Sequence, residues 1–152
     1  MASGLTTNYQ LNQWDAEDKV LRTEFHADNA KLDAALAGLA ATALKLAVGT
    51  YTGDGTASRV ISVGFTPKAV LVCTQSGLTY SPNASGYVYG GLALIGQPVC
   101  YRYKRGMAYP YEYFNAVELT TEGFQVCETK IDDYAGVYCN SVDTTYHYFA
   151  IG

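Results

Sequence analysis

Mostly apolar side chains recur at alternating intervals of four and three residues near the start of the chain. These positions are Phe25, Asn29, Leu32, Leu36, Leu39, Ala43 and Leu46. A mean spacing of 3.5 residues is typical of a helix that packs against other helices in a coiled coil. Three such heptads correspond to about 33 Å of helix. The pattern therefore predicts a short coiled-coil stalk, and a buried Asn29 would fix the register and the number of helices in it.

The start of this helix has two candidate signals. Asp15 opens an acidic turn suited to a helix N-terminus, and Trp14 just before it could pack on Val20 and Leu21. Thr23 offers a second N-cap. The alternative to a stalk between chains is a single amphipathic helix folded back on its own head.

The polar and apolar pattern changes after Leu46. Short alternating or apolar runs separated by Gly, Pro, Asn and Asp predict β-strands throughout. The predicted strands are Val48–Thr52, Arg59–Phe65, Ala69–Cys73, Tyr87–Ile95, Val99–Lys104, Tyr109–Glu118, Phe124–Thr129, Val137–Ser141 and Tyr146–Ile151. Asp54-Gly55 predicts a hairpin between the first two strands, and Ser76–Gly86 a surface loop. Ala69–Cys73 and the last strand are expected to be central.

The predicted fold is mainly β, with an antiparallel, jelly-roll-like β-sandwich head behind the helical stalk. Residues 1–46 form the N-terminal docking segment and coiled-coil helix, and residues 47–152 form the head. The formal net charge of the 152 residues is −4. This charge argues against nucleic-acid binding, which requires clustered Lys and Arg. A nearly neutral head suits uncharged sugars or another protein as a partner.

The compartment is predicted from the N-terminus and the cysteines. Met1–Gln10 has no secretion signal, and Leu32–Val48 is too short and too interrupted by charge to insert in a membrane. These features predict synthesis in a cytoplasm. The four cysteines are expected to be free thiols there, with a disulfide between strands as the alternative.

Tyrosine is concentrated in the middle of the predicted head. The candidate binding residues lie on one predicted hairpin and are Tyr101, Arg102, Tyr103, Arg105, Tyr109, Tyr111 and Tyr113. A turn at Arg105–Ala108 would place all five phenol rings on one face of the hairpin. Pro110 places the hairpin at a sheet edge because proline cannot donate to a ladder. Tyrosine suits the recognition of sugars and protein loops, but these rings could equally pack between subunits.

Candidate chemistry is weak elsewhere. His26 and His147 have no Ser or Cys partner that spacing would nominate, so no catalytic residue, metal site or cofactor is predicted. Asp132 and Asp133, with Glu128, could form a carboxylate pair or a calcium cage, which leaves a glycan-cleaving enzyme as a remote alternative.

Several segments carry a family resemblance. The stretch from Asn8 to Leu36 resembles the N-terminal segment of small phage and prophage tail proteins, and Tyr51–Ser58, Gly64–Val72 and Tyr146–Gly152 look like their β heads. The resemblance implies a homotrimeric tail-fibre or receptor-binding protein whose tip contacts a bacterial surface. The middle of the head, Thr74–Asp143, carries no such match.

The resemblance completes the functional expectation. The chain would be a non-enzymatic adhesin in the virion tail that binds a bacterial surface glycan or protein. Tyr9, Leu11 and Trp14 would dock it on other tail or baseplate proteins, unless they simply cap the stalk. The rival interpretation is a purely structural tail-tip or baseplate component with its tyrosines buried between subunits.

Overall fold

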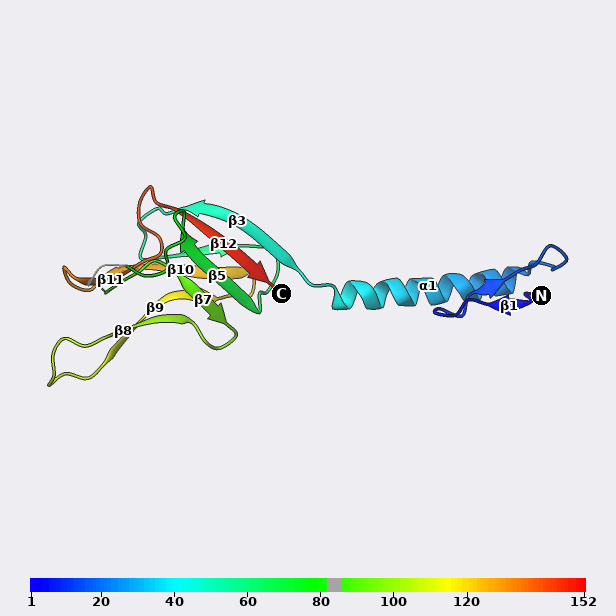
Figure 1. The fold of residues 1–152 in the computed structure, drawn as a ribbon, viewed down its shortest axis with the longest axis horizontal. Coiled ribbons are helices and arrows are strands. Elements are labelled where there is room, and N and C mark those ends of the chain that lie inside the picture. Colours follow the sequence, from blue (N-terminus) through cyan, green and yellow to red (C-terminus); the bar gives the residue numbers. More distant parts are fainter. Residues whose placement is uncertain (82–85) are drawn as a thin grey trace. The chain divides into compact units, whose positions relative to one another are not determined.

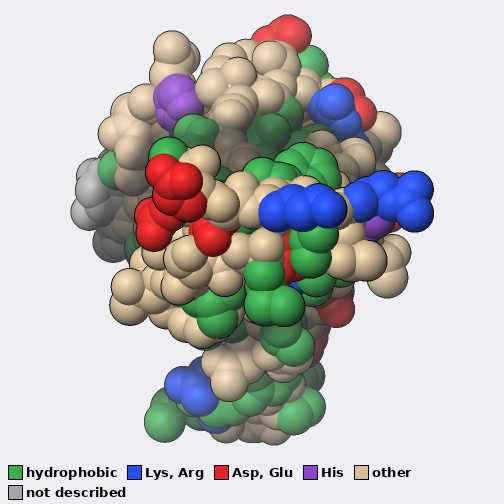
Figure 2. All heavy atoms as spheres, turned by 90° about the vertical axis from the view of Figure 1, so that its right-hand side faces the viewer, with side chains coloured by type: hydrophobic (Ala, Val, Ile, Leu, Met, Phe, Trp, Pro, Cys, Tyr) green, Lys and Arg blue, Asp and Glu red, His purple; other side chains and the backbone are tan. Residues whose placement is uncertain are grey.

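The structure, a computed structural model, describes residues 1–81 and 86–152. It divides into two compact units, Met1–Ala43 and Leu44–Gly152. With 44% strand and 14% helix, the protein is mainly β, as the sequence predicted. Residues 82–85 of the predicted loop Ser76–Gly86 lie outside the described residues. Hydrophobic side chains reach the protein surface among the charged ones (Figure 2).

The first unit contains one helix, α1 (Arg22–Thr42), and two short strands, β1 (Gly4–Leu5) and β2 (Asn12–Gln13) (Figure 1). Neither predicted helix start is used, because α1 begins after Leu21, which supplies no side-chain cap. Asp15 instead opens a turn in which the Asp15 carbonyl accepts a hydrogen bond from the Asp18 amide. The Asp18 carboxylate accepts hydrogen bonds from Ser3, so these acids hold the N-terminal segment rather than a helix.

The predicted stalk is shorter than the heptad pattern suggested. Ala43 is extended and ends α1, and Leu46 lies in a strand, so neither belongs to the helix. A single helix of 21 residues, about 32 Å long, argues against a long coiled-coil stalk. The remaining heptad positions are all exposed in this chain, including Asn29, and the apolar ones are Phe25, Leu32, Leu36 and Leu39. No helix in the described part of the chain is long and apolar enough to cross a membrane.

Polar contacts join the β1–β2 hairpin to the first half of α1. The buried carboxylate of Asp28 accepts hydrogen bonds from the backbone amide of Asn12 at 2.9 Å and from its side-chain amide at 3.0 Å. Lys31 lies 3.4 Å from the other side of this carboxylate. The Trp14 indole donates to Glu24 at 3.1 Å, so Trp14 contacts α1 rather than packing on Val20.

The second unit is built from ten strands in two sheets. The four-stranded sheet has the order β3-β12-β5-β7, with bounds Leu46–Thr52, Thr145–Ile151, Ala69–Thr74 and Gly91–Leu94. Its two middle strands, β12 and β5, are the ones predicted to be central, and that prediction is confirmed. In Figure 1 the chain ends in β12, between β3 and β5.

The six-stranded sheet is organised around β10 (Gly123–Lys130). Its other strands are β4 (Ser58–Ser62), β6 (Gly86–Val88), β8 (Val99–Tyr103), β9 (Glu112–Leu119) and β11 (Ala135–Tyr138). The first part of β10 pairs with β4 and β9, and its last three residues pair with β11. The β6–β11 pair is parallel, so the head is not purely antiparallel as predicted.

The two sheets pack face to face around one hydrophobic core. Phe124 of β10 contacts two rings of the other sheet, Tyr51 at a centroid distance of 6.2 Å and Tyr148 at 5.2 Å. Tyr51 also stacks on Tyr146 at 5.0 Å. Both of these buried phenols donate to backbone carbonyls at 2.6 Å, Tyr51 to Cys139 and Tyr146 to Tyr138. The hydroxyls are therefore satisfied, which burial of a tyrosine requires.

Two predicted local connections are wrong. Asp54-Gly55 does not close a hairpin, because β3 and β4 belong to different sheets. The predicted strand Tyr87–Ile95 is two strands, β6 and β7, which also belong to different sheets. At the junction, a Cβ on Gly90 would lie 2.1 Å from the Val72 carbonyl oxygen, and Gly91 has a φ of 146°. Only glycine fits both positions as the chain crosses between the sheets.

Candidate functional site

The β8–β9 hairpin carries the residues that the sequence nominated for binding. β8 is the last strand in its sheet order, which agrees with the predicted edge position. Its register pairs Arg102 with Tyr113 and Tyr103 with Glu112. Directly paired residues point to the same face of a sheet. The predicted face of five phenol rings is therefore wrong, and the tyrosines are divided between the two faces of the hairpin.

The outward face of this hairpin combines exposed tyrosines with two cations. The Arg102 guanidinium lies 4.2 Å from the centre of the Tyr111 ring, and the Lys104 ammonium lies 5.2 Å from it. Such cation–π contacts hold both side chains over the ring. Neither cation forms an ion pair with any residue in 1–81 or 86–152. Tyr111 and Tyr113 remain 47% and 65% exposed, so the face is open to a ligand.

The inward tyrosines of the hairpin support it rather than face solvent. Tyr101 packs against the hydrophobic core, and burial raises its pKa. Tyr103 donates a hydrogen bond from its hydroxyl to Asp132. That bond raises the pKa of Tyr103 and lowers that of Asp132. Both rings therefore position the hairpin, and the sequence reasoning did not separate this role from ligand contact.

The end of the hairpin is an exposed loop between β8 and β9. The Tyr109 amide donates to the Gly106 carbonyl at 3.1 Å, which closes a turn, and Met107 at its tip is 98% exposed. Arg105 forms an ion pair with Glu112 at 3.1 Å. Tyr109 is 60% exposed. The nominated residues on or beside the outward face are thus Arg102, Arg105, Tyr109, Tyr111 and Tyr113, with Lys104 added by the structure.

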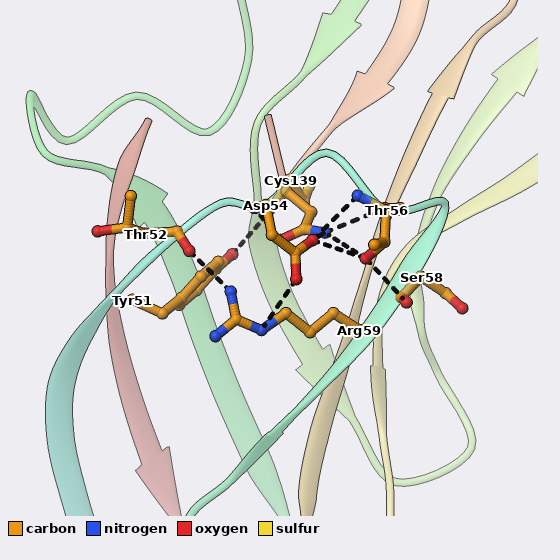
Figure 3. A network of polar contacts seen from close by, with 8 residues as sticks. Tyr51, Thr52, Asp54, Thr56, Ser58, Arg59 and Cys139 are labelled. Carbon is orange, nitrogen blue, oxygen red and sulfur yellow. Dashed lines mark hydrogen bonds and ion pairs between the residues drawn. The ribbon is translucent and has the colours of Figure 1, made fainter. Parts of the chain in front are cut away.

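A second polar cluster lies where the β3–β4 connection meets the segment after β11 (Figure 3). The fully buried side-chain amide of Asn140 donates to Asp54 Oδ1 at 2.6 Å and to the Thr56 carbonyl at 3.0 Å. Hydrogen bonds from Thr56 lower the pKa of Asp54 to about 2, so Asp54 is ionised at neutral pH. Arg59 lies 3.6 Å from the same carboxylate. Every polar group here has a partner within the protein, so the cluster fastens two loops together and leaves no group for a ligand.

The carboxylates that were considered for catalysis or calcium do not converge. Glu128 accepts hydrogen bonds from Ser141 Oγ at 2.9 Å and from the Asn140 amide, and burial raises its pKa. Asp132 is bonded to Tyr103, and Asp133 pairs with Lys130 at 2.8 Å. Among the described residues, no three His, Cys, Asp or Glu side chains are grouped as a metal site requires.

Two open cavities lie in the second unit, and neither is lined by the β8–β9 hairpin. One, of about 590 Å³, is lined by Thr74, Gln75, Ser76, Asp143, Thr144 and Thr145. The other, of about 560 Å³, lies around Thr66–Lys68, Ile95 and Leu119–Thr121. Apart from Asp143 and Lys68, their linings are uncharged, so the candidate site remains the outward face of the hairpin.

The nominated docking residues lie around the β1–β2 hairpin of the first unit. Tyr9, in the connection between the two strands, is 59% exposed, and Leu11 is half-buried. Trp14 is half-buried, with its indole nitrogen bonded to Glu24. Tyr9 is thus the most accessible of the three for contact with another protein.

Comparison of this chain with protein-family models, with curated proteins and with solved structures gives no match. The functional argument therefore depends on the chemistry of the outward hairpin face.

Proposed function

We propose that this protein is a phage-type tail-fibre or receptor-binding adhesin that attaches a virion tail to a bacterial cell-surface glycan or protein without catalysis. The observation that carries the proposal is the outward face of the β8–β9 hairpin, where Arg102 and Lys104 lie over the exposed ring of Tyr111. The resemblance of the N-terminal segment to small tail proteins supports the same conclusion.

The composition of this face suits reversible surface recognition. Tyrosine offers a large rigid apolar surface and a hydroxyl at low conformational cost, which fits the faces and hydroxyls of sugars. Because Arg102 and Lys104 are already held over a ring, binding loses little of their side-chain freedom. The face carries no nucleophile or paired carboxylate, so it binds without chemistry.

We further propose a homotrimer assembled through the exposed apolar strip of α1. The strip comprises Phe25, Leu32, Leu36 and Leu39, with Asn29 as the register-fixing polar position. Three copies present three hairpins, and multivalent binding can exceed the affinity of one site by factors of about 100 to 10,000. Tyr9 and its neighbours in the β1–β2 hairpin would contact other tail or baseplate proteins.

Substitution of Tyr111 tests the proposed binding face. We expect Tyr111→Ala to reduce binding of the labelled protein to host cells at least tenfold, because the ring supports both cations as well as contacting the ligand. Tyr134→Ala is the matched control, since Tyr134 is 77% exposed on the separate β10–β11 turn. Solution mass should be unchanged in both variants. Equal cell binding by the two variants would remove the hairpin face from the proposal.

A purely structural tail-tip component is the second candidate, and the exposed apolar strip of α1 favours it because such a surface suits contact between subunits. In that case the hairpin would be buried in the assembled particle. Cys100 lies exposed in β8, so its labelling by a maleimide reports whether the hairpin is open. Rapid labelling in the assembly supports the adhesin, and protection supports the structural component.

A further inference from the structure

The outer face of the four-stranded sheet is apolar over two complete rows of side chains. Across β3, β12, β5 and β7, the first row consists of Val48, Phe149, Leu71 and Leu92. The second row, in the same order, consists of Leu46, Ile151, Ala69 and Leu94. The residues that alternate with them, such as Val70, Val72 and Ala150, are fully buried in the core. The eight side chains therefore share the opposite, outer face of the sheet.

This outer face is unusually open for a folded protein. Six of its side chains are between 40% and 69% exposed, namely Leu46, Val48, Leu71, Leu92, Leu94 and Phe149. Together they present on the order of 500 Å² of apolar surface, near the upper end for the largest such patch on a monomer. A standard interface buries about 800 Å² per partner, so the rows and their rim supply an area of the right size.

The charged residues nearest in sequence lie beyond the ends of the rows rather than within them. Lys45 and Lys68 are exposed and immediately precede Leu46 and Ala69. The row on the other side contains Thr50, His147 and Cys73. An apolar centre inside a polar rim is the composition of a protein–protein interface, whereas the sugar-binding surface proposed above depends on tyrosines and cations.

We propose that the occupant of this face is a second copy of the same chain, packed sheet to sheet. A flat apolar face without a charged group is complementary to itself, and sheets pack face to face about 10 Å apart in sandwiches. Only Ala43–Lys45 separates α1 from Leu46, the first residue of the face. Copies joined through α1 would thus meet at a high effective concentration of the second surface. The inference goes beyond receptor attachment, because it holds whether or not the hairpin binds a receptor.

Charge placed on the outer face tests this proposal in the full-length chain. Val48→Lys puts an ammonium in the first row at a side chain that is 69% exposed, so the variant should fold. Val60→Lys is the matched control, because Val60 is 53% exposed on β4 of the other sheet. Both are made in the native chain and in a Leu36→Lys background, which disrupts the apolar strip of α1. Sedimentation velocity over a wide concentration range measures self-association, and circular dichroism checks folding.

In the Leu36→Lys background we expect concentration-dependent self-association that Val48→Lys weakens at least about tenfold and Val60→Lys leaves unchanged. Leu92→Lys, in the same row on β7, should reproduce the effect of Val48→Lys. The proposal is overturned if Val48→Lys and Val60→Lys associate equally, or if the Leu36→Lys protein is a monomer at every concentration. The second outcome would leave both the α1 trimer and the hairpin adhesin standing.

Discussion

Removal of the Asn140 side chain should destabilise the head more than most single substitutions outside the hydrophobic core. This fully buried amide donates to Asp54 and to Thr56, and its oxygen accepts from the Asp54 backbone amide at 3.3 Å. Each such hydrogen bond contributes about 1 kcal/mol, and unpaired buried partners add to the loss. We therefore expect Asn140→Ala to lower the free energy of unfolding by about 3 kcal/mol.

Urea denaturation at fixed protein concentration measures this effect, since self-association would otherwise shift the apparent stability. Asn115→Ala is the matched control, because Asn115 is exposed on β9 and bonds only its neighbour Glu118 at 3.1 Å. The control should lose less than about 0.5 kcal/mol. An Asn140→Ala variant as stable as the control would refute the view that this cluster fastens the two loops.

Two further predictions concern ionisable groups in the head. Burial raises the pKa of Glu128 in the folded state, so the free energy of unfolding should fall as pH rises from its ordinary pKa of 4.5 through the raised one. Glu128→Gln should remove that decline in denaturation curves measured between acid and neutral pH, and an unchanged pH profile would contradict the assignment. Among the four free thiols, exposed Cys100 should react first with a thiol reagent, whereas buried Cys139, whose pKa is raised by burial, should react only on unfolding. Native-state modification of Cys139 as fast as that of Cys100 would count against the packing described.

The elements that sequence reasoning located correctly are those whose pattern has a local cause. Ala69–Cys73 is a continuous apolar run, which is the composition of a strand buried in the middle of a sheet, and β5 occupies that place. Tyr146–Ile151 alternates, and β12 is likewise central. Helix α1 follows from its Ala- and Leu-rich composition, but the heptad pattern continued past its true end because Leu46 begins a strand.

The errors arise where contacts distant in sequence decide the structure. Asp54-Gly55 has the composition of a hairpin turn, yet Asn140 draws this segment across to the other sheet. A Cβ on Gly53 would lie 2.1 Å from the Ser141 carbonyl oxygen, so the two loops touch through backbone. The break between β6 and β7 did have a local signal, the pair Gly90-Gly91, which the apolar residues around it obscured.

The face of the tyrosine hairpin was mispredicted because of one residue of register. A turn at Arg105–Ala108 would have paired odd-numbered residues with each other. The actual loop pairs Tyr103 with Glu112, and a shift of one residue moves each side chain of a strand to the other face. That shift separates Tyr111 and Tyr113 from Tyr101 and places them beside Arg102. The cationic tyrosine face is thus a consequence of loop length, which composition alone does not determine.

The two surfaces proposed for binding lie on opposite sides of the sandwich. Tyr101 and Phe114 of the hairpin face the core, so Arg102 and Tyr113 point away from the four-stranded sheet. The apolar rows around Phe149 cover the outer side of that sheet. A second copy packed on these rows would bury apolar surface and leave the hairpin of each copy open. Self-association and attachment are therefore compatible in one assembly, and the first would raise the avidity of the second.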